Sequence, residues 1–255
     1  LKQRNRYEGL IGISPKMQEA YEIIERIGKR SPSVLIQGEK GSGKELVAKV
    51  IHRRSGRADG PFVPVNCSVI VEGSPESEFF DHITDLFDAA KGGTIFLDEV
   101  AEIPPSLQTK LLQAFQQQDE PHEGANGEPE TNVRIIAATE KDPDQFAKNG
   151  NFREDFFSRL DQFSLKLPPL RERREDICLL ANHFLAIYYN TIGEKVLAIS
   201  PEVMDIFLEH HWPGNVRQLE NIIKRAVGAG ADKIIEIAHL PREMRKLAMG
   251  NGGGL

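Results

Sequence analysis

The residues best suited to chemistry lie in a glycine-rich stretch early in the chain. Gly38-x-x-x-x-Gly43-Lys44 follows an apolar run at 33–37 and precedes a helical pattern of apolar residues. This spacing is typical of a phosphate-binding loop, in which backbone N–H groups and a helix N-terminus hold phosphates and the lysine reaches the β and γ oxygens. The dinucleotide-binding fingerprint Gly-x-Gly-x-x-Gly is excluded, because Leu46 stands where its third glycine would follow Gly41 and Gly43. A chance glycine turn is the remaining alternative, and the order of strand, lysine and helix disfavours it.

The predicted nucleotide contacts of this loop are eight consecutive residues: Gly38, Glu39, Lys40, Gly41, Ser42, Gly43, Lys44 and Glu45. Glu45 is unusual, because the generic loop has a serine or threonine hydroxyl for magnesium at that position. The chain must therefore hold Mg²⁺ in another way.

Two carboxylates follow a second apolar run. Residues 94–97 are Thr-Ile-Phe-Leu, and Asp98 and Glu99 come directly after them. Ligands of open α/β sheets bind at the edge formed by the carboxyl ends of the strands. Next to a phosphate loop, an aspartate there suits magnesium and a glutamate suits polarising a water molecule. Without a phosphate loop, an aspartate and a glutamate after a strand would not indicate a nucleotide site.

Composition limits the class of protein. The chain has 255 residues, of which 40% are hydrophobic and 27% charged, and this is ordinary for a globular protein. Its net charge of −6 argues against a protein that binds nucleic acid over its whole surface. No apolar run is long enough for a membrane span and no signal peptide opens the chain, so we expect no membrane partner. Cys67 and Cys178 lack metal or redox spacing, which favours a reduced cytoplasm.

The order of elements predicts a parallel α/β sheet, since strands alternate with helices. Strand-like runs occupy 33–37, 61–66, 94–98, 133–139 and 163–167, and helical patterns occupy 14–27, 43–51, 76–90, 107–115 and 151–160. Ser14-Pro15 is predicted to start the first of these helices, with the Ser14 hydroxyl as its N-cap and the proline in its first turn. The acidic, glycine- and proline-rich stretch 119–132 is predicted as an exposed loop.

After 168–169 the pattern becomes helical. Helices are predicted over 174–190, 200–211, 215–229 and 238–247, with start signals at Ser200-Pro201 and Gly214-Asn215. We therefore divide the chain into a linker (1–8), an α/β nucleotide-binding domain (9–168), an all-helical domain (169–247) and a flexible tail (248–255).

These motifs resemble the AAA+ ATPase domain of bacterial enhancer-binding transcription activators, the sigma-54-dependent regulator family. The resemblance extends over about residues 8–247. Its specific segments are Gly38-Glu-Lys-Gly-Ser-Gly-Lys44-Glu45, Gly92-Gly-Thr-Ile-Phe-Leu-Asp98-Glu99, Leu167-Pro-Pro-Leu-Arg-Glu-Arg173 and Trp212-Pro-Gly-Asn-Val-Arg217-Gln-Leu-Glu220. The family usually carries glutamate after the loop lysine, so Glu45 is expected. The resemblance implies a RecA-like α/β fold with a helical lid.

The resemblance also implies roles for single residues. Lys44 would bind phosphate, Asp98 would hold Mg²⁺, Glu99 would activate water for ATP hydrolysis, and Asn66 would restrain Glu99. The remaining positions are Thr139 at sensor I, Arg153 and Arg159 as arginine fingers acting on a neighbouring subunit, and Arg217 at sensor II. The implied assembly is a hexameric or heptameric ring, with a dimer as the inactive form.

Each of these roles has a simpler alternative in the residues alone. Arg153 and Arg159 could be solvated charges on a helix, Asn66 could merely end a strand, and Arg217 could be a structural ion-pair partner. The cluster of Arg171, Arg173 and Arg174 is interleaved with acids. We expect that cluster to form a solvated, mutually paired face rather than a nucleic-acid patch.

Two departures from the family affect function. Activators that remodel sigma-54 polymerase carry an inserted loop with Gly-Ala-Phe-Thr-Gly-Ala, whereas residues 76–90 here read as one unbroken amphipathic helix. Glu140 stands where the family usually has asparagine, and a carboxylate near the γ-phosphate would slow hydrolysis.

We therefore expect the ATPase domain of a transcriptional regulator that works independently of sigma-54. Its partners would be further copies of itself, RNA polymerase, and DNA through a helix-turn-helix outside this chain. One alternative is a sigma-54 activator that uses another loop, such as 119–132. The other is a module that binds a nucleotide or another ligand without hydrolysis.

Overall fold

The structure is a computed structural model that describes residues 6–28, 33–68, 76–119, 133–142, 153–192, 198–228 and 234–250. The predicted loop over 119–132 lies outside these residues except for its first position, and so does most of the predicted tail. The chain divides into two compact units. The α/β unit contains Glu19–Glu39 and Lys44–Leu167, and the helical unit contains Leu1–Gln18, Lys40–Gly43 and Pro168–Leu255. Each unit is described by itself.

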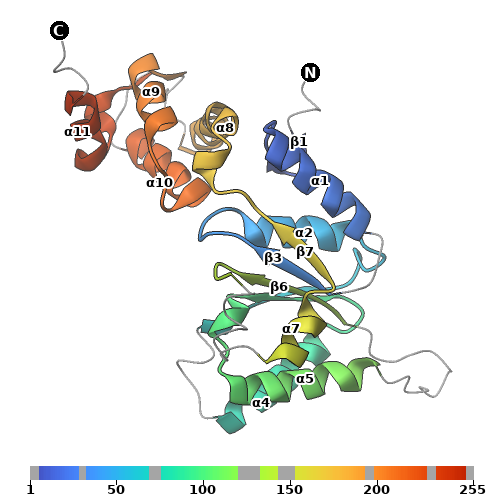
Figure 1. The fold of residues 1–255 in the computed structure, drawn as a ribbon. Coiled ribbons are helices and arrows are strands. Elements are labelled where there is room, and N and C mark those ends of the chain that lie inside the picture. The colour runs from blue at the N-terminus through green and yellow to red at the C-terminus, as the bar shows by residue number, and fades with distance from the viewer. Residues whose placement is uncertain are drawn as a thin grey trace. The chain divides into compact units, whose positions relative to one another are not determined.

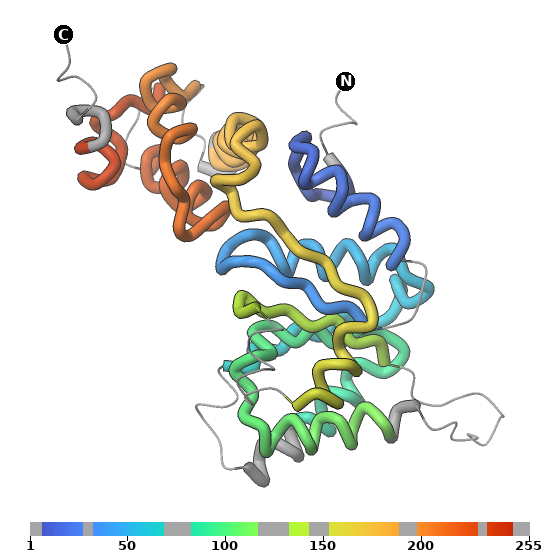
Figure 2. The backbone as a smooth tube through the Cα atoms, in the orientation of Figure 1, coloured from blue at the N-terminus to red at the C-terminus, as the bar shows by residue number. Residues whose placement is uncertain are grey.

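The α/β unit is built on a five-stranded sheet whose strands are all parallel. In sequence order the strands are β3 (Val34–Gln37), β4 (Phe62–Asn66), β5 (Thr94–Asp98), β6 (Arg134–Thr139) and β7 (Phe163–Lys166). Their spatial order is β4-β5-β6-β3-β7. The earliest strand therefore lies between two later ones, as the colours of Figure 2 show. All five strands are predicted correctly from the sequence.

The register brings particular strand ends together. Asn66 pairs with Asp98 across β4 and β5, and Gln37 pairs with Thr139 across β3 and β6. Since every strand runs the same way, these residues and the start of the glycine-rich loop share one edge of the sheet. This is the edge at which ligands of open α/β sheets bind.

Helices cover both faces of this sheet. They are α2 (Lys44–Arg53), α4 (Glu76–Ala89), α5 (Pro105–Asp119), α7 (Glu154–Leu160) and the short 3-10 helix η1 (Val100–Glu102). In Figure 1, α2 lies on one face and α4, α5 and α7 lie on the other. Stacked rings of Phe115 and Phe156, with centroids 5.9 Å apart, join α5 to α7 within the core.

The helical unit contains the four predicted helices: α8 (Glu175–Ile192), α9 (Pro201–Glu209), α10 (Asn215–Gly228) and α11 (Arg242–Gly250). Two 3-10 helices accompany them: η2 (Leu170–Glu172) precedes α8, and η3 (Ile237–His239) lies between α10 and α11. The start signals are confirmed, because α9 begins at Pro201 with the Ser200 hydroxyl accepting from Val203 N–H. Trp212 is fully buried in the unit's core, and its indole N–H donates to the carbonyl of Phe207.

Short strands are the main difference from prediction. The strands β8 (Ala198–Ile199) and β9 (Ile234–Ile235) form a parallel pair inside the region predicted as all-helical. A second pair, β1 (Arg6–Tyr7) and β2 (Leu10–Ile11), begins within the predicted linker. Two-residue strands are too short to carry the alternation by which a strand is recognised. The helix α1 (Pro15–Gly28) starts at the predicted proline. Within the described residues, no helix is long and apolar enough to span a membrane.

Candidate nucleotide-binding site

Lys44 is the first residue of α2 and lies at the carboxyl edge of the sheet. Its ammonium group donates to the carbonyl of Gly38 at 2.9 Å and lies 3.1 Å from Oε1 of Glu99. The side chain is only 6% exposed. The buried Lys44 ammonium group therefore has two partners, the Gly38 carbonyl and the Glu99 carboxylate. These contacts keep it at the start of the glycine-rich loop, where a phosphate-binding lysine is expected.

Glu99 connects two strands of the edge. Its second carboxylate oxygen, Oε2, accepts the backbone N–H of Glu140 at 3.3 Å, directly after β6. The backbone of Glu99 is left-handed, with φ 54° and ψ 48°, because the chain turns sharply from β5 into η1. This conformation is uncommon for a residue with a side chain, and such backbone strain concentrates at functional sites. It aims the carboxylate back over the sheet edge.

Asp98 ends β5 beside Glu99. Its Oδ1 accepts the backbone N–H of Glu99 at 3.1 Å. Burial, and then the neighbouring Glu99 carboxylate, raise the pKa of Asp98, while Lys44 opposes the shift. Burial of the Cys67 thiol, and then the charges of Asp98 and Glu99, raise the pKa of that thiol. The carboxyl edge of the sheet therefore carries two carboxylates, Asp98 and Glu99, beside the one ammonium group of Lys44.

A divalent cation would relieve this charge. Mg²⁺ takes oxygen ligands and usually bonds to one or two carboxylates together with substrate phosphates. The described residues contain no group of three or more histidine, cysteine or acidic side chains that could hold a metal alone. A single half-buried aspartate beside a phosphate loop fits magnesium held jointly by protein and nucleotide.

Thr139 and Asn66 end the strands on either side of β5. Thr139 is buried, its carbonyl accepts the N–H of Gly38 at 3.0 Å, and its hydroxyl accepts the N–H of Lys141. Asn66 lies in register with Asp98, but its carboxamide oxygen accepts the N–H of Ser68 at 3.1 Å. The structure thus brings Asn66 beside the carboxylate pair and gives its carboxamide a local partner, so its restraint of Glu99 stays a prediction.

Glu45 lies on the exposed side of α2. Its carboxylate pairs with Lys49, one helical turn on, at 2.7 Å, and both side chains are about half exposed. The pair is an ordinary i, i+4 ion pair on a helix surface.

The two candidate arginine fingers flank α7. Arg153 precedes the helix and its guanidinium forms a two-pronged pair with the Asp155 carboxylate, with distances of 3.1 and 2.8 Å. That pairing raises the pKa of Arg153, whose side chain is exposed. The N–H of Arg153 donates to the buried Gln108 amide, which also donates to the carbonyl of Ile103. Arg159 is half-buried in the last turn of α7. Neither arginine is joined to the Lys44–Glu99 pair in the described contacts.

In the helical unit, residues 40–43 of the loop are held by side chains from distant sequence. Asn215, fully buried and left-handed at φ 50°, accepts the N–H of Leu170 and donates to the carbonyl of Lys40 at 3.1 Å. The N–H of Arg217 donates to the carbonyl of Gly41 at 3.3 Å. A side chain at position 41 would collide with the carbonyl of Gly214, and Gly41 has φ +76°. The loop tip therefore requires glycine at this position.

Arg173 is a site residue that sequence reasoning missed. The expectation of a solvated arginine cluster is wrong for it, because it is 3% exposed. Its guanidinium donates to the carbonyl of Ser42 at 2.9 Å and contacts the Met17 sulfur at 3.0 Å. The interleaved acids suggested mutual pairing, yet Glu172 pairs with Lys16 instead. The spacing of charges along one segment cannot reveal a carbonyl partner 131 residues away.

Asp176 is a second missed residue. It is fully buried and accepts from the N–H of Ile13 and from both the N–H and hydroxyl of Ser14. The hydroxyl predicted to cap α1 therefore donates to α8. No local motif in the sequence marks such a contact.

Comparison with known protein families accounts for nearly the whole chain. Residues 10–166 match the family model described as the sigma-54 interaction domain, and residues 171–251 match the AAA+ ATPase lid domain. The chain belongs to the sigma-54 interaction domain family. The P-loop fold with a helical lid and the membership implied by the motifs are thereby confirmed.

Curated relatives of this sigma-54 interaction domain include a nitrogen fixation protein and a regulatory protein. The chain is 40% identical over 256 residues to the nitrogen fixation protein AnfA of Azotobacter vinelandii, covering 96% of this chain and 48% of that protein. It is 42% identical over 244 residues to the regulatory protein AtoC of Escherichia coli K12, covering 91% and 53%. The chain thus spans about half the length of these relatives.

Solved structures of NtrX from Brucella abortus share the fold. The complex with ATP has a TM-score of 0.82 at 33% identity, and the complex with ADP has a TM-score of 0.80 at 34% identity. Each alignment covers 93% of this chain and 55% of the NtrX chain.

Proposed function

We propose that this chain is the ATP-binding, slowly ATP-hydrolysing and ring-forming domain of a cytoplasmic bacterial transcriptional regulator that acts independently of sigma-54. The observation that supports it most directly is the contact of the buried Lys44 with Glu99 at the strand edge. A phosphate-binding group and a water-activating group are adjacent there. The NtrX neighbours, which bind ATP and ADP, support the nucleotide class.

The contact of Lys44 with Glu99 suggests how binding and hydrolysis are coupled. In the structure, the Glu99 carboxylate is the counter-ion of the Lys44 ammonium group. A bound triphosphate would offer Lys44 a stronger partner, because it carries several negative charges whereas the carboxylate carries one. Glu99 would then lose its cation and become available as a base.

Hydrolysis would use Glu99 as the group that accepts a proton from the attacking water. Its Oε2 is already held by the Glu140 N–H, which orients the carboxylate. Mg²⁺ held by Asp98 and the phosphates would supply neutralisation of developing charge. The exposed Glu140 carboxylate adds negative charge nearby, which opposes charge build-up on the γ-phosphate. We therefore expect slow turnover.

Assembly would complete the site. Arg153 directly precedes α7 and Arg159 lies in its last turn. The guanidinium of Arg153 pairs with Asp155 and not with the Lys44–Glu99 pair, so an arginine serving that pair would come from another copy. Arg153 would first exchange its Asp155 partner for phosphate. Such an exchange fits a ring in which each copy supplies arginines to its neighbour.

Independence from sigma-54 is supported by the segment between β4 and β5. The printed sequence contains no Gly-Ala-Phe-Thr-Gly-Ala, and α4 runs without interruption from Glu76 to Ala89. Ile83 and Phe87 on this helix are buried in the sheet's core, so opening α4 would expose them. A loop extended from this helix would therefore cost core packing.

The family match itself favours a second candidate, an activator of sigma-54 polymerase that uses another surface, such as residues 119–132. In vitro transcription from a sigma-54 promoter, at concentrations where rings form, separates the two. ATP-dependent open complexes would support this second candidate and refute independence from sigma-54.

The nucleotide assignment has its own test by calorimetry. Lys44→Ala should abolish tight ATP binding, whereas Glu99→Ala should bind ATP but not turn it over, since only the lysine acts on ground-state phosphates. Unchanged ATP affinity in Lys44→Ala would refute the phosphate-loop assignment. ATP binding by the parent without turnover at any protein concentration would support a non-hydrolysing module instead.

A further inference from the structure

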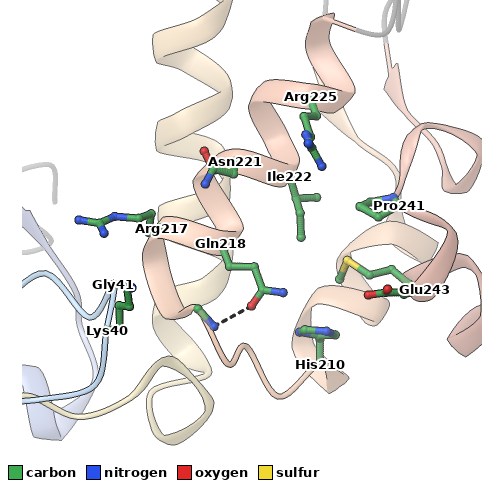
Figure 3. Close-up of a pocket in the computed structure, with 12 residues that line it drawn as sticks. Lys40, Gly41, His210, Arg217, Gln218, Asn221, Ile222, Arg225, Pro241 and Glu243 are labelled. Atoms are coloured by element: carbon green, nitrogen blue, oxygen red, sulfur yellow. Dashed lines mark hydrogen bonds between the residues drawn. The ribbon is translucent and has the colours of Figure 1, made fainter. Parts of the chain in front are cut away.

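A pocket within the helical unit is separate from the Lys44–Glu99 pair. Its volume is about 370 Å³, within the range of small-molecule sites. It is lined by Lys40, Gly41, His210, Gly214, Arg217, Gln218, Asn221, Ile222, Arg225, Pro241, Glu243 and Met244. In Figure 3, Ile222 and Arg225 face the space between α10 and the segment with Pro241 and Glu243, whereas Arg217 points away from it.

The polar groups that face this pocket are nearly all donors. The backbone N–H of Gly214 donates to the side-chain oxygen of Gln218 at 2.9 Å. The side-chain NH₂ of Gln218 is therefore the group that can donate to a ligand. The backbone N–H of Trp212 donates to Nδ1 of His210 at 2.9 Å. Burial, and then His211, lower the pKa of His210, so the ring is neutral and carries its proton on Nε2.

Cations add to these donors. Arg225 lies about two helical turns beyond Arg217 on α10, about 12 Å along the helix axis, and faces the pocket. In the described contacts, neither Arg225 nor Lys40 has an ion-pair or hydrogen-bond partner for its side chain. The single acid of the lining is Glu243, which is exposed. Donors and unpaired cations around one cavity select an anion.

The floor of the pocket is apolar. Ile222 and Met244 are buried in the core of the unit and Pro241 lies beside them. A bare phosphate would leave this floor uncovered, whereas a flat ring would pack on it, and a guanidinium stacks on such rings. Glu243 can accept from a hydroxyl or amino group of the same ligand.

We propose that this pocket binds a small organic phosphate with a flat ring and donor groups, the chemistry of a nucleoside monophosphate. Its distinctive contacts are Arg225, Gln218, His210 and Ile222, none of which belongs to the predicted ATP contacts. Lys40 and Gly41 form one rim and are part of the phosphate loop. A ligand here therefore touches the loop directly, and its binding would be linked reciprocally to that of ATP.

The test is calorimetric titration with AMP in the Lys44→Ala chain, in which the phosphate loop is disabled. We expect saturable binding that weakens about tenfold or more in Lys44→Ala/Arg225→Ala, since one charge-assisted bond to phosphate is lost. Arg245→Ala, an exposed arginine of α11 outside the lining, is the matched control and should bind AMP as the Lys44→Ala chain does. Both arginines are exposed, so neither change should disturb folding.

Hydrogen exchange gives a second readout. AMP should slow exchange in α10 and around Pro241–Met244 and leave α8 unchanged. Inorganic phosphate, titrated separately, should bind at least tenfold more weakly than AMP, because it covers none of the apolar floor. Absent AMP binding, equal binding in the Arg225 variant, or equal affinity for free phosphate would each overturn the proposal. The pocket does not require hydrolysis, so these outcomes leave the proposed ATPase function untouched.

Discussion

Different interactions hold the two parts of the glycine-rich loop, its ends at Gly38 and Lys44 and its tip at residues 40–43. In the α/β unit, Gly38 and Lys44 are placed by strand register and by the first turn of α2, with support from five parallel strands. In the helical unit, residues 40–43 are placed by a few buried polar side chains, chiefly Asn215 and Arg173. One part depends on many backbone hydrogen bonds, and the other depends on single contacts.

This difference predicts different responses to mutation. A substitution at the sheet edge should change chemistry and leave the fold intact, because the backbone ladder does not depend on the side chains at strand ends. A substitution among the buried polar side chains should change stability first, because each satisfies a carbonyl or N–H that water cannot reach.

Arg159→Ala should give the largest effect and spare the fold. Supplying such an arginine is worth about 10³–10⁵ in rate in other phosphoryl-transfer systems, so hydrolysis should fall by that order while ATP binding persists. Mixing with Glu99→Ala should restore part of the activity, since each variant keeps what the other lacks. Steady-state ATPase assays on exchanging mixtures measure this, with the exposed Lys49→Ala as control. Parent-like turnover by Arg159→Ala alone would remove its role in trans.

Asn215→Ala should destabilise the chain by about 1–3 kcal/mol, the cost of leaving a buried group unsatisfied. Its amide satisfies both Leu170 N–H and the Lys40 carbonyl, and alanine tolerates its left-handed backbone less well. ATP affinity should fall together with stability. Denaturant titration measures the change, and exposed Asn221→Ala on the same helix is the control. Equal stability of both variants would contradict the contrast drawn between the two parts of the loop.

Asp98→Asn should raise the melting temperature without nucleotide by about 2–4 °C, the shift expected for roughly 1 kcal/mol. Because folding raises the pKa of Asp98, its charged form destabilises the fold. The stability of the parent relative to Asp98→Asn should therefore increase as pH falls through the raised pKa. Magnesium-dependent ATP binding should be lost in the same variant. A variant less stable than the parent at neutral pH would show that the carboxylate supports the fold.

Glu45→Ala should have the smallest effect, at most about 0.5 kcal/mol, because its pair with Lys49 is exposed. Magnesium-dependent ATP binding should be unaffected within a factor of about two to three. Thermal unfolding and calorimetry with Mg-ATP test both statements, and Lys49→Ala is the paired control. Loss of magnesium dependence in Glu45→Ala alone would assign this glutamate to the metal.

Local pattern was sufficient to predict most of the architecture. The apolar runs before Gly38 and Asp98 had the composition and flanking turns of buried strands, and both are strands of the observed sheet. The starts of α1, α9 and α10 followed from Ser-Pro and Gly-Asn pairs, whose capping preferences are properties of neighbouring residues. The placement of Asp98 and Glu99 at the ligand-binding edge of the sheet followed from one rule, since parallel strands bring their carboxyl ends to one edge.

Contacts between distant segments lay beyond that pattern. Arg173 looked like one member of a charged surface cluster, and its burial against the Ser42 carbonyl depends on how α8 packs. The same holds for Asp176, whose partners at Ile13 and Ser14 lie more than 160 residues away. The sequence alone determined the periodic elements and the loop chemistry, because both arise from residues within a few positions. Only the tertiary structure decided which polar side chains are buried and which backbone groups they satisfy, because that depends on the packing of elements far apart in the chain.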